Sequence, residues 1–230
     1  TQTAGVSLTA QQPEINIIRV ALQAMAAVLG GTQSLHTNSM DEALALPSEQ
    51  AATIALRTQQ IIAEESGVAN TVDPLGGSYF VEAMTNRLEA QVYEYFQQIS
   101  DLGGVLPAIQ KGFFQGEISN SAYRYQREIE QGERKIIGVN AYQEDQPPEI
   151  PLLEMDPQGF KNQVERLTQL RKKRDQGRVG QALDRLRLAC QGTENTMPYL
   201  LEAVHAYATL GEIVDVMRDV FGEFREDQWI

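Results

Sequence analysis

The sequence of 230 residues carries 19 lysines and arginines against 31 aspartates and glutamates, which gives a formal net charge of −12 at pH 7. An acidic surface repels phosphate backbones and anionic lipids, so nucleic acids and membrane surfaces are excluded as principal partners. The 42% hydrophobic content supports a folded core and argues against general disorder.

The chain has one cysteine, Cys190, and therefore cannot form an intrachain disulfide. Cys190 lies in an apolar helical pattern, which favours a buried structural thiol over a nucleophile. The sequence contains no run of about 18 apolar residues and no signal peptide, so we expect a cytoplasmic protein. It opens on Thr1, in a segment typical of the end of a strand, which indicates a processed chain or a part of a longer one.

The first part of the chain alternates between short strands and amphipathic helices. The pattern predicts the end of a strand within 1–9 and strands at 32–38 and 71–72, and it predicts helices at 14–30, 41–46, 48–66 and 79–102. Asp41 can cap the helix 41–46, and Gly30 with Gly31 stops the first one. Such alternation is typical of parallel α/β architecture, in which the carboxyl ends of the strands build the site. The pattern alone does not separate a barrel from a doubly wound sheet.

After about residue 103 the pattern becomes mostly helical. Helices are predicted at 104–114, 117–131, 157–174, 177–191, 196–208 and 210–222, with a short strand at 135–142 and a proline-rich connector at 143–151. The basic run at 171–174 has acidic residues around it and indicates a solvated helix end. We therefore divide the chain into a strand–helix part (1–102), a helical segment with a short strand and connector (103–150), and a helical C-terminal region (151–230).

Three strings are too specific to arise by chance. They are QTAGVSLT at 2–9, GGTQSLHTN at 30–38 followed by DEAL at 41–44, and DPLGGSY at 73–79. With GVNAY at 138–142 and TLGEIVDVMRDVFGEF at 209–224, they resemble the adenosylcobalamin-dependent acyl-CoA mutases, the methylmalonyl-CoA mutase family, over essentially the whole chain. The resemblance implies an α/β fold, with the last three strands of a (β/α)8 TIM barrel followed by a mostly helical region. It also implies an isomerase that performs a radical 1,2-rearrangement of the carbon skeleton of an acyl-CoA, of the methylmalonyl-CoA/succinyl-CoA type.

The resemblance assigns contacts with adenosylcobalamin to five residues, namely Gln2, Gln33, Glu42, Ala43 and Gln126. A glutamine amide both donates and accepts hydrogen bonds, and the carboxylate of Glu42 suits ribose hydroxyls. Without the family resemblance, we would predict that Gln2 and Gln126 are solvated and that Glu42 only stabilises the first turn of its helix. No catalytic and no metal-ligating residue is assigned.

Four neighbours of these residues are given supporting roles. Asn38 is expected to contact a coenzyme-binding residue and not the coenzyme itself. Gly5 and Gly31 would let the backbone approach the corrin ring. His36 suits either a hydrogen bond in the packing or a ligand contact, and we do not assign it a catalytic role. The second histidine, His205, is expected to be structural.

Two departures from the family leave the substrate and the partners open. Many methylmalonyl-CoA mutases carry tryptophan where this chain has Val6, and small residues are frequent there in isobutyryl-CoA and 2-hydroxyisobutyryl-CoA relatives. The DxHxxG signature, whose histidine supplies the lower ligand of cobalt, does not occur in the sequence. The expected partners are therefore an acyl-CoA, a small cobalamin-binding subunit or domain, and the N-terminal part of the barrel with the CoA-binding residues, in a dimer or heterotetramer. A non-catalytic module for subunit assembly and an unrelated barrel enzyme are the alternatives.

Overall fold

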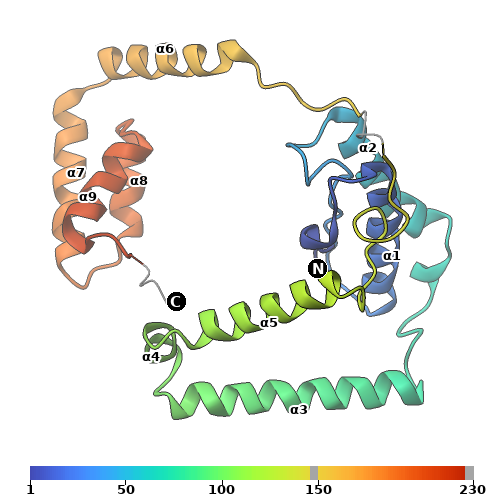
Figure 1. Cartoon of the computed structure of the whole chain (residues 1–230). Coiled ribbons are helices and arrows are strands. Elements are labelled where there is room, and N and C mark those ends of the chain that lie inside the picture. The colour runs from blue at the N-terminus through green and yellow to red at the C-terminus, as the bar shows by residue number, and fades with distance from the viewer. Residues whose placement is uncertain (146–149, 226–230) are drawn as a thin grey trace. The chain divides into compact units, whose positions relative to one another are not determined.

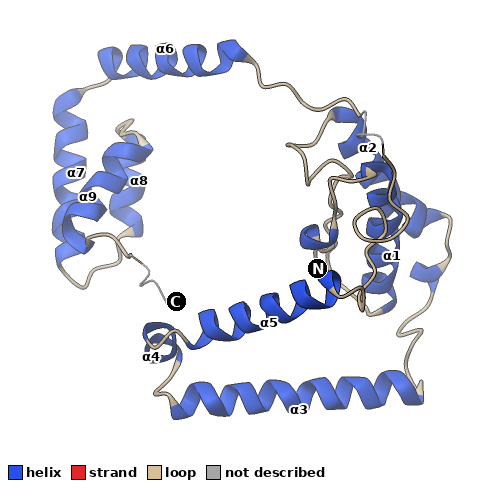
Figure 2. Ribbon diagram, in the orientation of Figure 1, coloured by secondary structure: helices blue, strands red, loops and turns tan. Residues whose placement is uncertain are grey.

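The computed structural model describes residues 1–145 and 150–225, and these residues form helices joined by loops (Figures 1 and 2). The chain divides into two compact units, one of Thr1–Glu154 and one that begins at Met155. No helix in the described ranges is long and apolar enough to cross a membrane.

Helices α1 (Asn16–Leu29) and α2 (Glu49–Glu64) pack against each other and hold the core of the first unit. Ala24 and Ala51 are fully buried, and the small side chains allow the two helices to approach closely. Ser48 begins α2 as its N-cap, because its hydroxyl accepts a hydrogen bond from the Ala51 N–H at 3.2 Å. Three short 3₁₀ turns join these helices to their loops, η1 (Gly5–Ser7), η2 (Pro13–Ile15) and η3 (Val68–Asn70).

The loop 131–142 returns to the start of α1 and is held there by two side chains. The Arg19 guanidinium donates to the Ile137 carbonyl at 2.7 Å, and the Gln12 amide donates to the Tyr142 carbonyl at 2.9 Å. These hydrogen bonds link segments about a hundred positions apart in the sequence, at separations of 118 and 130 residues. The loop is therefore part of the same folded unit as α1.

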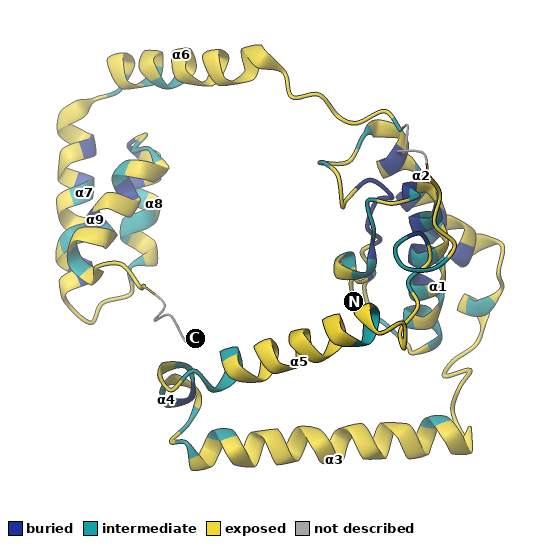
Figure 3. Ribbon diagram, viewed as in Figure 1, coloured by how far each residue is buried: buried dark blue, intermediate teal, exposed yellow. Residues whose placement is uncertain are grey.

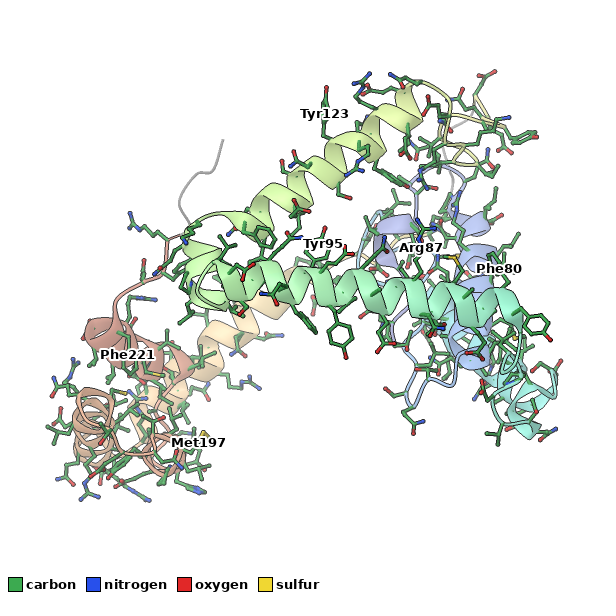
Figure 4. The ribbon with its side chains drawn as sticks, turned by 90° about the horizontal axis from the view of Figure 1, so that it is seen from below. Phe80, Arg87, Tyr95, Tyr123, Met197 and Phe221 are labelled. Carbon is green, nitrogen blue, oxygen red and sulfur yellow. The ribbon has the colours of Figure 1, made fainter. Side chains whose placement is uncertain are left out.

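Three helices follow α2 in the sequence before this loop, namely α3 (Tyr79–Asp101), α4 (Val105–Gln110) and α5 (Phe113–Glu130). The Tyr95 hydroxyl of α3 donates to a Glu117 carboxylate oxygen of α5 at 2.7 Å, and the Tyr95 and Phe113 rings lie 6.4 Å apart. Neither α3 nor α5 has a buried residue (Figure 3). Figure 4 shows the α3 side chains standing out around its ribbon, from Phe80 near its start to Tyr95 toward its end.

The second unit contains α6 (Pro157–Lys173), α7 (Gln176–Gln191), α8 (Met197–His205) and α9 (Leu210–Phe221). The last three helices enclose a core, and Leu186 at its centre is fully buried. The buried members of this core are Val179, Ala182, Leu186, Cys190, Ala203, Ala206, Ile213 and Val216. Cys190 is thus a buried core thiol, as its helical pattern predicts.

The predicted α/β fold with TIM-barrel strands is wrong. Among the residues that the structure describes there is no strand, and the only extended pairings are two isolated parallel bridges, Gln2–His36 and Ile137–Ala141. Near the first bridge, the His36 N–H donates to the Thr1 carbonyl at 2.9 Å and the Thr3 N–H donates to the His36 carbonyl at 3.0 Å. Two such bonds make a bridge, whereas a sheet needs longer ladders and more strands for stability.

The segment 135–142 forms turns instead of the predicted strand because Asn140 bonds to nearby backbone groups. Its side-chain oxygen accepts from the Ile136 N–H at 2.7 Å, and its amide donates to the carbonyls of Ile129 and Arg134 at 3.0 and 2.8 Å. Local bonds of this kind compete with a strand ladder. The predicted strand at 71–72 is also absent, and Val72 is 95% exposed.

Candidate functional site

Two neighbouring hollows lie against α2 in the first unit. The larger has a volume of about 710 Å³, and its lining includes the polar residues His36 and Glu42. The smaller has a volume of about 350 Å³, and Gln33 is part of its wall. Both are lined by Leu35, Leu56 and Gln59. Predicted site residues thus border both hollows, with Glu42 on the larger one.

Glu42 is exposed, but its carboxylate is held by buried neighbours. The Asn38 amide donates to Glu42 Oε2, and the Asn38 side-chain oxygen accepts from the Thr3 hydroxyl at 2.7 Å. Thr3 and Asn38 are only 4% and 3% exposed. The other carboxylate oxygen, Oε1, lies close to Gly5, where an added Cβ would collide with it. The carboxylate is therefore positioned by an amide on one side and by the space left at a glycine on the other.

The exposed turn that carries Glu42 directly follows a buried segment, residues 37–41. Residues 37–41 are all buried, whereas Glu42, Ala43 and Leu44 are exposed. The fully buried Asp41 accepts from the Ser48 N–H through Oδ2 at 2.8 Å, and its backbone carbonyl accepts from the Leu44 N–H at 2.8 Å. The segment 41–46 is therefore a series of turns and not the predicted short helix.

A second buried asparagine, Asn16, joins the buried segment 37–41 to α1. Asn16 is fully buried, and its amide donates to the carbonyls of Met40 and Thr9 at 2.8 and 2.9 Å. The Arg19 guanidinium donates to the Asn16 side-chain oxygen at 2.7 Å. Hydrogen bonds from a charged donor are among the stronger ones, so Arg19 holds the Asn16 side chain in place. Asn16 in turn holds Met40, two residues before Glu42, against the first turn of α1.

The structure brings some of the predicted coenzyme residues together. Gln2 is exposed and lies in the bridge with His36, in the same small region as Glu42 and Ala43. Gln33 is exposed on the segment that leads to this bridge. Gln126 lies elsewhere, on α5, and its amide donates to Glu130 one turn later at 2.9 Å. No contact described for the first unit joins Gln126 to the other four.

Comparison with known proteins decides the family. The sequence pattern of the family described as methylmalonyl-CoA mutase matches residues 1–223. The chain belongs to the methylmalonyl-CoA mutase family. The membership expected from the motifs is therefore confirmed.

Relatives within the family extend over almost all of this chain. It is 43% identical over 227 residues to the 2-hydroxyisobutanoyl-CoA mutase large subunit of Aquincola tertiaricarbonis, covering 98% of this chain and 40% of the relative. It is 44% identical over 225 residues to the methylmalonyl-CoA mutase of Rhizobium meliloti (strain 1021), covering 97% and 32%. Against the mitochondrial methylmalonyl-CoA mutase of Homo sapiens the identity is 42% over 226 residues, covering 97% and 30%. The chain thus spans 30–40% of the length of these mutases.

The family motifs predict a role for Gln2 and none for Thr3, the next residue. Thr3 is buried and bonds to Asn38 across 35 positions of sequence. Successive side chains of an extended segment point to opposite sides. An outward Gln2 therefore requires an inward Thr3, and this alternation is the signal in the sequence that could have identified it.

Proposed function

We propose that this chain forms the coenzyme-facing part of an adenosylcobalamin-dependent acyl-CoA mutase, an isomerase that rearranges the carbon skeleton of its substrate by a radical 1,2-shift. The observation that carries the proposal is the position of Glu42. It is an exposed carboxylate on a buried, hydrogen-bonded turn, at the edge of a hollow of about 710 Å³. Such a residue is oriented before any ligand arrives.

The groups around the hollow fit the nucleoside part of the coenzyme. Glu42 Oε2 already accepts from Asn38, and a carboxylate oxygen has two acceptor positions, so capacity remains for ribose hydroxyls. Leu46 and Leu56 provide apolar surface for a flat base. When bound, adenosylcobalamin would supply the radical by homolysis of its cobalt–carbon bond.

The chain's own residues would then bind, orient and exclude water. Glu42 would hold the ribose, and the methyl group of Ala43 would leave room beside it. Gln2 and Gln33 would offer amides that donate and accept at once. Gln126 would join them from α5 only by exchanging its hydrogen bond to Glu130. We propose no acid–base role for any residue of this chain.

The first candidate substrate is that of the methylmalonyl-CoA/succinyl-CoA type, and Val6 supports a small branched acyl group as the second. Its side chain is 98% exposed in η1, directly after Gly5, whose neighbour in space is Glu42. A small side chain here supports an isobutyryl-CoA or 2-hydroxyisobutyryl-CoA mutase as the alternative to the methylmalonyl-CoA/succinyl-CoA type. Turnover of the three acyl-CoA esters by the complete enzyme would decide between them.

The proposed activity requires partners. One relative is named as a large subunit, and the DxHxxG string is absent from residues 1–230. We infer a small cobalamin-binding subunit or domain that supplies the lower cobalt ligand, and a further part of the catalytic subunit that binds CoA, assembled as a dimer or heterotetramer in the cytoplasm. A role in subunit assembly alone is the competing proposal.

Titration of the complete complex with adenosylcobalamin, followed by its visible absorbance, tests the function. We expect a saturable change on binding and turnover of one of the three acyl-CoA esters. If the absorbance does not change at any coenzyme concentration, the proposed function is wrong. If coenzyme binds but none of the three esters is turned over, the three proposed substrates are wrong and a role in subunit assembly is favoured.

Replacement of Glu42 by alanine tests the residue that carries the proposal. Loss of a hydrogen bond to a charged group costs about 1.5–3 kcal/mol, so the Kd for adenosylcobalamin should rise at least about tenfold. Glu65→Ala is the matched control, since Glu65 is exposed at the end of α2 and lines neither hollow. Equal Kd values for Glu42→Ala and Glu65→Ala would remove Glu42 from the coenzyme site.

A further inference from the structure

The buried pair Thr3 and Asn38 is joined by two hydrogen bonds, in which the Thr3 hydroxyl acts once as acceptor and once as donor. The Asn38 backbone N–H donates to the Thr3 hydroxyl oxygen at 2.9 Å. The Thr3 hydroxyl donates its own hydrogen to Asn38 Oδ1 at 2.7 Å. The oxygen of the Asn38 amide thus faces Thr3, and the NH₂ group faces the other way, toward Glu42. An asparagine amide has two orientations, and the neighbouring donors decide which one is stable.

The amide orientation matters because Glu42 is an acceptor when it is ionised. In the orientation fixed by Thr3, Asn38 presents an N–H to Glu42 Oε2. In the flipped orientation it would present Oδ1, and two oxygens that both accept would repel each other. Because Asn38 is 3% exposed, little water is available to relieve that repulsion. Glu42 would then rotate out of its position beside Gly5.

We propose that Thr3 is a positioning residue for Glu42, acting through the amide of Asn38. Its hydroxyl selects the orientation in which Asn38 donates to the carboxylate, and so holds Glu42 ready for the coenzyme. This inference rests on the proposed function in so far as Glu42 contacts the ligand. The hydrogen bonds themselves are independent of any ligand and can be measured in the complete complex without coenzyme.

The test uses two substitutions at Thr3. Thr3→Val keeps the shape and removes the hydroxyl, and Thr3→Ser keeps the hydroxyl and removes a methyl group. In the complete complex, Thr3→Val should raise the Kd for adenosylcobalamin about fivefold, the equivalent of one ordinary hydrogen bond. Thr3→Ser should restore most of the affinity. A serine variant as weak as the valine variant would overturn the proposal, because the hydroxyl would then not be the active feature.

A double-mutant cycle separates positioning from a general structural effect. If Thr3 acts through Glu42, Thr3→Val should change the Kd hardly at all when Glu42 is already alanine. An equal loss in both backgrounds would show that Thr3 supports the site independently of Glu42, and would overturn the proposal. Thr58→Val is the matched control, since Thr58 is also buried, makes a hydrogen bond to Ile54 within α2 and lines neither hollow. It should leave the coenzyme Kd unchanged.

A measurement without coenzyme distinguishes failure of this inference from failure of the proposed function. The side-chain NH₂ signals of Asn38 should shift when Glu42 is replaced by glutamine, in the ¹⁵N NMR spectrum of the complete complex without coenzyme and with only this chain labelled. The same replacement should produce no such shift in the Thr3→Val chain. A shift of equal size in both chains would overturn the inference. If the NMR result is as expected but Glu42→Ala leaves the coenzyme Kd unchanged, the positioning stands and the coenzyme assignment fails.

Discussion

Gly5 leaves the space in which the Glu42 carboxylate lies. A Cβ at this position would collide with Glu42 Oε1 and would lie 2.9 Å from Asn38 Nδ2. The end of an exposed glutamate moves away easily, but the buried Asn38 amide must also shift, so Gly5→Ala should lower the free energy of unfolding by about 1–2 kcal/mol, a modest loss. The displaced carboxylate should nevertheless raise the Kd of the complete complex for adenosylcobalamin about fivefold or more. Thermal unfolding and the absorbance titration measure the two effects.

Gly116→Ala is the control for Gly5→Ala. Gly116 lies in α5, and an added Cβ would meet no described atom within 4 Å outside the backbone of its own helix. Because alanine favours a helix over glycine by about 1 kcal/mol, this change should stabilise α5 slightly and leave coenzyme binding unaltered. A Gly5→Ala variant that binds coenzyme as tightly as Gly116→Ala would show that the position of Glu42 does not depend on Gly5.

At the scale of single residues, the sequence predicts roles for Glu42 and for its neighbour Asn38, but none for Thr3. Glu42, Asn38 and Gly5 stand within recognisable strings. The hydrogen bond from Thr3 joins positions 35 apart, and the contact between Gly5 and Glu42 is not encoded in any local pattern. That Gly5 allows a corrin ring to approach stays a prediction, and the structure adds a contact of Gly5 with a side chain of the same chain. Spacing along the sequence cannot show such contacts.

At the scale of elements, a buried arginine joins three parts of the second unit. The Arg174 guanidinium, at the end of α6, donates to the Tyr207 carbonyl at 2.8 Å and to Glu212 Oε2 at 2.7 Å. Glu212 also completes a capping box with Thr209 at the start of α9, where its carboxylate accepts from the Thr209 N–H at 2.8 Å. One carboxylate therefore fixes both the start of α9 and the end of α6.

The hydrogen bond from Arg174 is the main reason why the pKa of Glu212 falls from 4.5 to about 2. A pKa that is lower in the folded state stabilises the fold above the unfolded pKa, and this contribution is lost as the pH falls toward the folded one. The second unit should therefore lose about 1–2 kcal/mol between pH 4.5 and 2, a range that allows for the 25% exposure of the Glu212 side chain. Denaturant unfolding at several pH values, followed by signals from α7 to α9, measures the loss.

Glu212→Gln removes the titrating group and should remove this part of the pH dependence, while lowering stability at pH 7. Glu202→Gln is the matched control, because the Glu202 carboxylate pairs with Arg185 on the surface, where side-chain exposures are 39% and 59%. Exposed pairs contribute about 0–1 kcal/mol. A Glu212→Gln variant that retains the full acid dependence would assign the effect to other carboxylates.

The helices were predictable and the strands were not, for a physical reason. A helix satisfies its backbone within itself, so periodicity and caps such as Ser48 and Asp156 mark it locally. The predicted helices at 14–30, 48–66, 79–102 and 210–222 are confirmed with small shifts at their ends. A strand depends on partners elsewhere in the chain, and the segment 32–38 finds only one bridge.

At the scale of the whole molecule, buried apolar residues divide between the two units. The first unit buries Val20, Ala24, Ala51, Ala55 and Ile62 from α1 and α2, and the second buries a cluster drawn entirely from residues 179–216. Each group belongs to one compact part of the chain. Separate cores can open separately, so local stability is expected to differ between the units.

Leu186→Ala tests this separation. Leu186 is fully buried at the centre of the second core, and truncation of a buried leucine costs about 2–5 kcal/mol. Amide hydrogen exchange should accelerate throughout α7, α8 and α9 by the factor that corresponds to this loss, while α1 and α2 keep their protection. Leu188→Ala on the same helix is the control, since Leu188 is 68% exposed and its removal should change stability by less than about 0.5 kcal/mol. Equal loss of protection in α1 and α2 would show that the two cores unfold as one, and the residues proposed to contact the coenzyme around Glu42 would then depend on the helical C-terminal region for their stability.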